Sequence, residues 1–137
     1  MRTHEETARR WLAQAENELK ITRSLADSGF WSGACFHAEQ TAQLALKSFL
    51  YLKGSRFVNI RSIRALVQEC GKEAPQFLAS ENAGLILDRY YLATRYPDVL
   101  PEPAVPFEAF SQQEARQALD FAEEIFSLAR QRTEDAP

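Results

Sequence analysis

Apolar residues recur at intervals of three and four along most of this 137-residue chain, a spacing that gathers them on one helix face. Two long segments show it most clearly, in the series Trp11, Ala15, Leu19, Thr22, Leu25 or Ala26, and in the series Ala115, Ala118, Leu119, Ala122, Ile125, Phe126, Ala129. No segment reads convincingly as a strand, and there is no internal repeat. The pattern predicts an all-α fold, an antiparallel up-and-down bundle of four to five helices. An armadillo-like array is the alternative, but it would need more repeats to bury its ends.

Capping residues mark the ends of the long helices. The three-residue spacing of a capping box occurs twice, in Thr3–Glu6 and in Ser111–Glu114. Gly29 and Gly54 stand where a left-handed residue closes a helix. Between these signals the apolar face of the second segment is wide and rich in alanine, so that another helix can approach it closely. Long helices are therefore predicted over residues 3–28, 31–53 and 111–132.

The middle of the chain carries weaker signals. A short helix is predicted from its apolar residues Ile60, Ile63, Leu66 and Val67 and ends at Cys70-Gly71. A further helix is predicted over about residues 74–96, which Gly84 is able to split near 80–82 and which Pro97 ends. Its expected core anchors are Phe77, Leu78, Leu85, Leu92 and Tyr96. Three prolines then predict an extended, non-helical linker over residues 98–110.

Length and composition place the chain in a broad class. One domain is expected over residues 1–137, with a helical core at 3–132 and a disordered tail at 133–137. The chain has neither the apolar segment of a signal peptide nor a run of the ~20 apolar residues that span a membrane. A cytoplasmic protein without membrane association is therefore expected, and Cys35 and Cys70 are predicted to be free thiols. The net charge of −3 argues against general DNA binding.

The second segment and its surroundings contain an ordered set of motif residues. They run Trp11-x3-Ala15-x3-Leu19, then Gly29-Phe30-Trp31-x2-Ala34-Cys35-Phe36-His37-Ala38-Glu39-Gln40, then Ala42, Ala45-Leu46-Lys47 and Leu50. Over about residues 5–132 the chain resembles the HEPN family, whose name means higher eukaryote and prokaryote nucleotide-binding domain. The later stretch Tyr91-x3-Arg95-Tyr96-Pro97-Asp98 is similar to the Tyr…Arg-Tyr-Pro segment of one bacterial and archaeal branch.

The resemblance implies a helical bundle that usually dimerises, and it implies several classes of function. Many such proteins are paired with a minimal nucleotidyltransferase, as a substrate-binding subunit or as a toxin with its antitoxin. Other members are metal-independent ribonucleases. Others have lost catalysis and bind nucleotides or RNA.

Two departures from the family pattern argue against ribonuclease activity. The ribonuclease branch carries an Arg, four to six residues and then a His, but here Arg89 is followed by no His, and His37 is the last histidine of the chain. The family also often has a Thr-His pair at the start of the short third helix, where this chain has Arg61. The imidazole that would act on the 2′-hydroxyl or the leaving oxygen is therefore missing.

Motifs for other chemistries are incomplete. His37-Ala38-Glu39 matches half of a zinc-deaminase motif, but the Pro-Cys-x-x-Cys half is absent. Cys35 and His37 are two residues apart on a helix, so their side chains diverge. The chain contains no Gly-rich phosphate loop or dinucleotide-binding motif. No catalytic residue, metal site or cofactor is therefore predicted.

The stretch from Lys47 to Arg64 contains five basic residues and no acid. Lysine and arginine side chains bind phosphate through charge-assisted hydrogen bonds. Lys47 and Arg61 are therefore candidate anion ligands. The alternative is that this stretch is simply a solvated basic face.

Residues 88–98 form the densest cluster of polar and aromatic residues. Guanidinium groups match the geometry of phosphate, and tyrosine rings stack on bases. The candidate groove residues are Arg89, Tyr91, Arg95 and Tyr96. The alternative is that Asp88 and Asp98 pair with the arginines while the tyrosines pack between helices.

These observations favour a non-catalytic HEPN-type module that binds a nucleotide or docks a nucleotidyltransferase partner, including in a toxin–antitoxin-like pair. A ribonuclease in which Arg89, Arg95 and Tyr96 replace the Arg-His pair is one alternative, and a purely structural interaction bundle is another. The wide apolar faces predict a homodimer with twofold symmetry.

Overall fold

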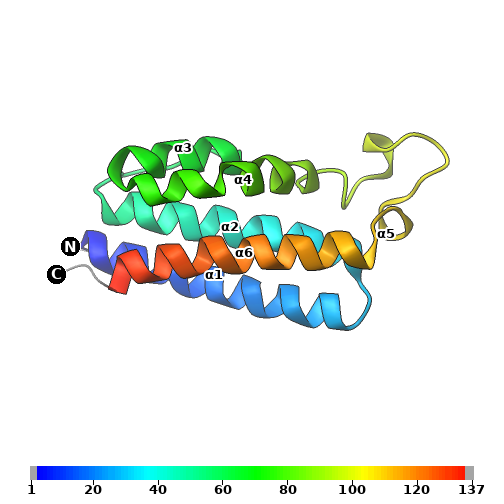
Figure 1. The fold of residues 1–137 in the computed structure, drawn as a ribbon, viewed down its shortest axis with the longest axis horizontal. Helices are drawn as coiled ribbons and strands as arrows, with labels where there is room; N and C mark the ends of the chain where they lie inside the picture. The colour runs from blue at the N-terminus through cyan, green and yellow to red at the C-terminus, as the bar shows by residue number, and fades with distance from the viewer. Residues whose placement is uncertain (1–2, 135–137) are drawn as a thin grey trace.

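The computed structural model describes residues 3–134. The helices, with η marking 3-10 turns, are α1 His4–Asp27, α2 Trp31–Leu52, α3 Ile63–Glu73, η1 Pro75–Ser80, α4 Glu81–Leu87, η2 Asp88–Tyr90, η3 Pro97–Val99, α5 Pro106–Ala109 and α6 Gln112–Glu134. In Figure 1, α2 lies between α1 and α6 on one side and α3 with α4 on the other. The all-α bundle predicted from the apolar spacing is confirmed. Within the described range, no helix combines the length and the apolar character needed to cross a membrane.

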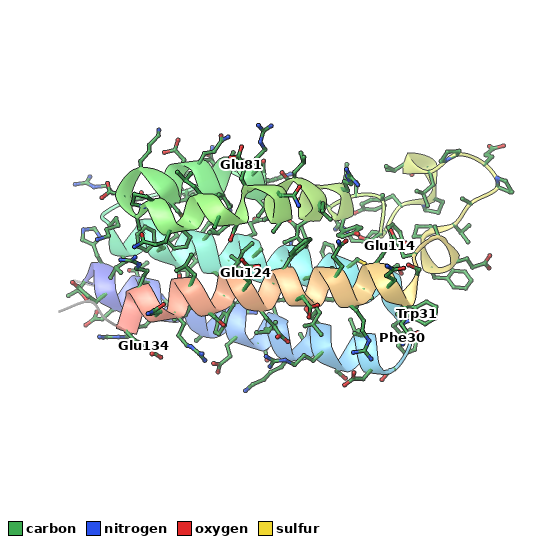
Figure 2. All side chains as sticks on the ribbon, in the orientation of Figure 1. Phe30, Trp31, Glu81, Glu114, Glu124 and Glu134 are labelled. Carbon is green, nitrogen blue, oxygen red and sulfur yellow. The ribbon has the colours of Figure 1, made fainter. Side chains whose placement is uncertain are left out.

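Of the three long helices, α2 and α6 run in the same direction and α1 runs in the opposite one. Trp31, at the start of α2, lies at the same end of the bundle as Glu114 near the start of α6, whereas Glu134 lies at the opposite end (Figure 2). α1 therefore runs antiparallel to both α2 and α6. Four alanines on α2 are fully buried, which lets the neighbouring helices approach closely: Ala34, Ala38, Ala42 and Ala45.

Both predicted capping boxes are present. The Glu6 backbone N–H donates to Thr3 Oγ1 at 3.0 Å, and the Thr3 N–H donates to Glu6 Oε2 at 3.2 Å. The Ser111 hydroxyl accepts the Glu114 N–H at 3.1 Å, and the Glu114 carboxylate accepts the Ser111 N–H at 3.0 Å. These bonds satisfy backbone donors that a helix start leaves unpaired, so they fix where α1 and α6 begin. Gly29 and Gly54 have φ of +84° and +106°, as expected for residues that close helices.

The helix predicted over residues 74–96 is split near residues 80–82, as Gly84 was expected to allow, and it does not continue as a helix to residue 96. The chain forms η1, breaks at Ser80, continues as α4 and η2, and then makes turns to Arg95. Gly84 packs so closely on α3 that an added Cβ would lie 3.0 Å from the Arg64 backbone nitrogen. This contact, together with the tighter 3-10 turns, rotates a different set of side chains into the core: Ala83, Leu87 and Tyr90.

The rotation also changes the core anchors. Of the five expected anchors only Phe77 is buried, and the four others are about half exposed: Leu78, Leu85, Leu92 and Tyr96. Pro97 does end the helical turns, because Tyr96 before it is extended at φ −121° and ψ 118°.

Two other limits differ from the sequence-based expectation. The linker over 98–110 contains short helical turns, η3 and α5, because Pro97 and Pro106 each occupy a first helical position that tolerates proline. The last helix continues to Glu134 and not to residue 132, since Thr133 is buried and its hydroxyl donates to the Ala129 carbonyl at 2.9 Å. The rest of the predicted tail, residues 135–137, lies outside the described residues.

Candidate functional site

Arg95 is the centre of the main cluster of candidate residues. Its Cζ lies 4.4 Å from the ring centre of Phe36, 4.9 Å from that of Tyr91 and 5.0 Å from that of Tyr96. Cations placed this close to aromatic faces are attracted by the ring quadrupole. The guanidinium also donates two hydrogen bonds to the Tyr91 carbonyl, at 2.6 and 3.0 Å from Nη2 and Nε. These contacts hold the side chain of Arg95 in place although the residue is exposed to solvent.

Arg61 joins this cluster from the connection between α2 and α3. Its Cζ lies 5.7 Å from the ring centre of Tyr91, so that Arg61 and Arg95 both contact the same tyrosine. We call Phe36, Arg61, Tyr91, Arg95 and Tyr96 the Arg95 cluster.

Asp88 explains why these distant segments meet. Its carboxylate accepts the Ile63 backbone N–H at 2.5 Å and the Ser62 hydroxyl at 2.8 Å, so it ties η2 to the start of α3. A negative charge at a helix start is favoured by the helix dipole. Within the part of the chain that the structure describes, Asp88 thus bonds to α3 and forms no ion pair with Arg61 or Arg95.

A second group of polar side chains lies on α2, which is otherwise mostly apolar. The Glu39 carboxylate is fully buried and accepts hydrogen bonds from Gln40 Nε2 at 2.7 Å and Gln43 Nε2 at 3.0 Å. Lys47 Nζ in turn donates to Gln43 Oε1 at 3.1 Å. We call Glu39, Gln40, Gln43 and Lys47 the polar row.

The pKa of Glu39 is raised to about 6, mainly by burial and to a smaller extent by the nearby Asp88 carboxylate. The two amide hydrogen bonds and the Arg95 charge act in the opposite direction, because they stabilise the ionised form. These effects place Glu39 within electrostatic range of the Arg95 cluster.

Lys47 differs from the exposed anion ligand that the sequence predicted. Its side chain is only 8% exposed and its Nζ lies 5.9 Å from the Trp11 ring centre. Burial and the Arg61 charge lower the pKa of Lys47, whereas Glu39 opposes this shift. Lys47 is buried because α1 covers α2 at this position. It therefore supports the candidate site from the protein interior and does not lie on a solvated basic face.

Arg89 is the candidate residue that the structure separates from the others. It lies exposed on η2, and within residues 3–134 its guanidinium forms neither an ion pair nor a cation–π contact. The proposed alignment of Arg89 with Tyr96 assumed a continuous helix, which the turns over residues 91–95 replace.

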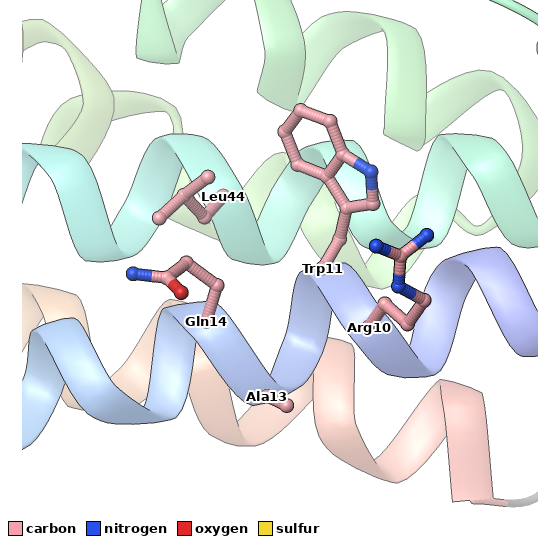
Figure 3. Close-up of a pocket in the computed structure, with 5 residues that line it drawn as sticks. All are labelled: Arg10, Trp11, Ala13, Gln14 and Leu44. Atoms are coloured by element: carbon pink, nitrogen blue, oxygen red, sulfur yellow. The ribbon is translucent and has the colours of Figure 1, made fainter.

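A groove between α1 and α2 borders the polar row. It has a volume of about 520 Å³ and is lined by Arg10, Trp11, Ala13, Gln14 and Leu44 (Figure 3). Trp11, which also approaches Lys47, connects this groove to the candidate site. From the sequence, Trp11 was predicted to belong to an apolar stripe and to the family motif, but not to line a groove.

Four residues of the site were not among the candidates predicted from the sequence: Phe36, Glu39, Gln40 and Gln43. A signal was available, because positions 36, 40, 43 and 47 follow helical spacing along an otherwise apolar helix. Polar residues on a face that should be buried are informative, since burial without partners is costly. Burial of Glu39 itself could not be read from this pattern.

Comparison with known proteins decides the family. The model of the HEPN domain matches residues 8–132, most of the chain. The chain belongs to the HEPN family. Its fold is similar to the crystal structure of TT1696 from Thermus thermophilus, with a TM-score of 0.83 and 31% identity over 91% of this chain and 97% of that one.

Two further proteins are similar to this chain. ST0689, an archaeal HEPN homologue, has a TM-score of 0.76 and 26% identity over 97% of this chain and 99% of its own. Human Sacsin is 29% identical over 117 residues, which cover 82% of this chain but only 2% of Sacsin. The match therefore concerns a small part of that protein.

The histidine position bears on the ribonuclease branch of the HEPN family. His37, the last histidine in the chain, is on α2, where its Nδ1 lies 2.5 Å from Glu18 Oε2 on α1. It does not belong to the Arg95 cluster or to the polar row.

Proposed function

We propose that this HEPN domain binds a nucleotide, or a nucleotide-bearing substrate, without catalysing its conversion. The observation that carries this proposal is that Arg61 and Arg95 both contact one tyrosine ring, Tyr91. Among residues 3–134 neither arginine forms an ion pair with a carboxylate. Two cations without acidic partners suit a phosphate group, and an aromatic ring suits a base.

The nucleotide can be free or carried by a partner. The family resemblance makes a minimal nucleotidyltransferase the partner that we propose, in a cytoplasmic complex in which this chain is the substrate-binding subunit or one member of a toxin–antitoxin-like pair. In either case Arg61 and Arg95 would contact the phosphates, and Tyr91 would contact the base.

Catalysis is not part of the proposal, because no histidine follows Arg89 and the Arg…His pair of the ribonuclease branch is therefore missing. Glu39 has a pKa of about 6, which suits a general base near neutral pH. However, its carboxylate is fully buried and both of its oxygens accept hydrogen bonds from Gln40 and Gln43. It therefore cannot reach a substrate hydroxyl in this arrangement.

Thermal-shift measurements with ATP, GTP, CTP, UTP, NAD and a short RNA test the proposal. A ligand at 100 times its dissociation constant stabilises a protein by about 2.7 kcal/mol, which raises Tm by several degrees. We expect such a shift with at least one nucleotide for the wild type, and its loss in Arg95→Ala.

Arg89→Ala is the matched control, because it removes an exposed arginine from the same segment but outside the cluster. It should keep the shift. The absence of a shift with every ligand, or its equal loss in both variants, would contradict the proposal. Cleavage of the RNA during the same incubation would favour the ribonuclease alternative.

A further inference from the structure

The hydrogen bonds around Glu39 fix the orientation of two amide groups. An ionised carboxylate can only accept hydrogen bonds, so Gln40 and Gln43 must each direct their NH2 group towards Glu39. Their carbonyl oxygens therefore point away from it. Lys47 reinforces this orientation, since its Nζ donates to Gln43 Oε1.

The two glutamines lie on the stripe of α2 that faces the Arg95 cluster. Along that stripe Gln40 and Gln43 fall between Phe36 and Lys47 in successive turns. Phe36 on this stripe contacts Arg95, which also acts electrostatically on Glu39, and Arg61 acts electrostatically on Lys47. Both arginines that contact Tyr91 therefore lie within electrostatic range of the polar row.

We propose that the polar row makes this a site for nucleobases that carry an exocyclic amino group, with Glu39 as the positioning residue. The inference rests on the proposed function, since it concerns the base of a nucleotide bound there. An amino group donates to a glutamine carbonyl oxygen, whereas a base with an oxygen at the same position places two acceptors against each other. That mismatch costs the hydrogen bond and leaves both acceptors unsatisfied.

Glu39 acts through the amides and does not touch the ligand. In Glu39→Gln the new side chain has one acceptor and one donor group. The new side chain can accept a hydrogen bond from the NH2 group of one neighbouring glutamine, but it must donate one to the carbonyl oxygen of the other. The side-chain amide of one of the two glutamines therefore turns over. The site would then present one carbonyl oxygen and one NH2 group to the base, and the preference for an amino group would be lost.

ATP and ITP are the matched probes, because the 6-amino group of ATP is replaced by oxygen in ITP while the sugar and phosphates are unchanged. Calorimetric titration at pH 7.5 should give about tenfold tighter binding of ATP to the wild type, as expected for one good hydrogen bond. In Glu39→Gln the ratio of the ITP and ATP dissociation constants should fall to about one. In the wild type the ratio should also narrow below pH 6, as Glu39 gains a proton.

Two further variants keep the test informative. Gln40→Met removes one carbonyl acceptor at a partly exposed position, so it should reduce the ATP preference even if Glu39→Gln does not fold. Arg89→Ala should leave the ratio unchanged. Equal binding of ATP and ITP by the wild type, or an unchanged preference in Glu39→Gln, would overturn this inference while the proposed function stands. If neither ATP nor ITP binds, this inference is overturned, whereas the proposed function falls only if no nucleotide of the thermal-shift series binds either.

Discussion

Glu39 is the residue with the most unusual environment in this HEPN domain. A buried carboxylate is unfavourable unless hydrogen bonds compensate for lost hydration, and here two glutamine amides supply them. The compensation is incomplete, because burial still raises the pKa of Glu39 to about 6 from its usual 4.5. The protein therefore gives up some stability at neutral pH for a charged group beneath the candidate site.

This cost predicts a pH effect on folding. Since the folded pKa of Glu39 lies above its unfolded value, the native state binds more protons between pH 4.5 and 6. The contribution of Glu39 to the free energy of unfolding should fall by about 2 kcal/mol as pH rises through this window. Glu39→Gln cannot titrate and should lack this decrease.

Urea denaturation of both proteins at pH 4 and pH 7.5 measures the difference. The other carboxylates are common to both proteins, so their contributions cancel. Glu39→Gln should gain about 2 kcal/mol relative to the wild type between the two pH values. An equal pH dependence in the two proteins would show that Glu39 titrates normally.

At the scale of the elements, the long helices follow from local sequence and the middle of the chain does not. Capping boxes, closing glycines and apolar stripes determine α1, α2 and α6 nearly to the residue. The break between η1 and α4 depends on Gly84 packing against the start of α3, about twenty residues earlier. Because helix period alone cannot reveal that contact, the core anchors of this segment were mostly wrong.

Two glycines test this explanation of the α3–α4 packing. An alanine at Gly84 would meet rigid backbone of Ile63 and Arg64, so Gly84→Ala should lower the free energy of unfolding by about 1–3 kcal/mol. An alanine at Gly71 would meet only the half-exposed side chain of Leu78, which can rotate away. Gly71→Ala should therefore change stability by no more than about 1 kcal/mol.

Urea denaturation of the two variants at one pH makes the comparison. Equal effects of the two substitutions would mean that α4 can move away from α3 at little cost. That result would contradict the assignment of Gly84 as the residue that sets the rotation of α4.

The candidate site shows the same division between local and distant information. The contact of Arg95 with Tyr91 follows from their four-residue separation. The approach of Arg61 depends on the bond from Asp88 to the start of α3, which no local pattern specifies. The burial of Lys47 and the exposure of Arg89 likewise result from how whole helices are placed.

At the scale of the whole molecule, the structure changes the reason to expect a dimer. The wide apolar face of α2 is covered within one chain by its neighbouring helices, so it does not require a second copy. Several large apolar residues remain about half exposed or more, including Phe57, Leu85, Leu92 and Phe107. The homodimer thus stays a prediction, now based on these residues and on the family.

The central claim is that a nucleotide binds between the Arg95 cluster and the polar row. The most direct test is a nitrogen-15 NMR titration with ATP, which reports each backbone amide and each glutamine side-chain NH2 separately. We expect saturable shifts at Tyr91, Arg95 and the side chains of Gln40 and Gln43, with little change at Arg89. Shifts confined to the α1–α2 groove, at Trp11 and Gln14, or no shifts at all, would contradict it.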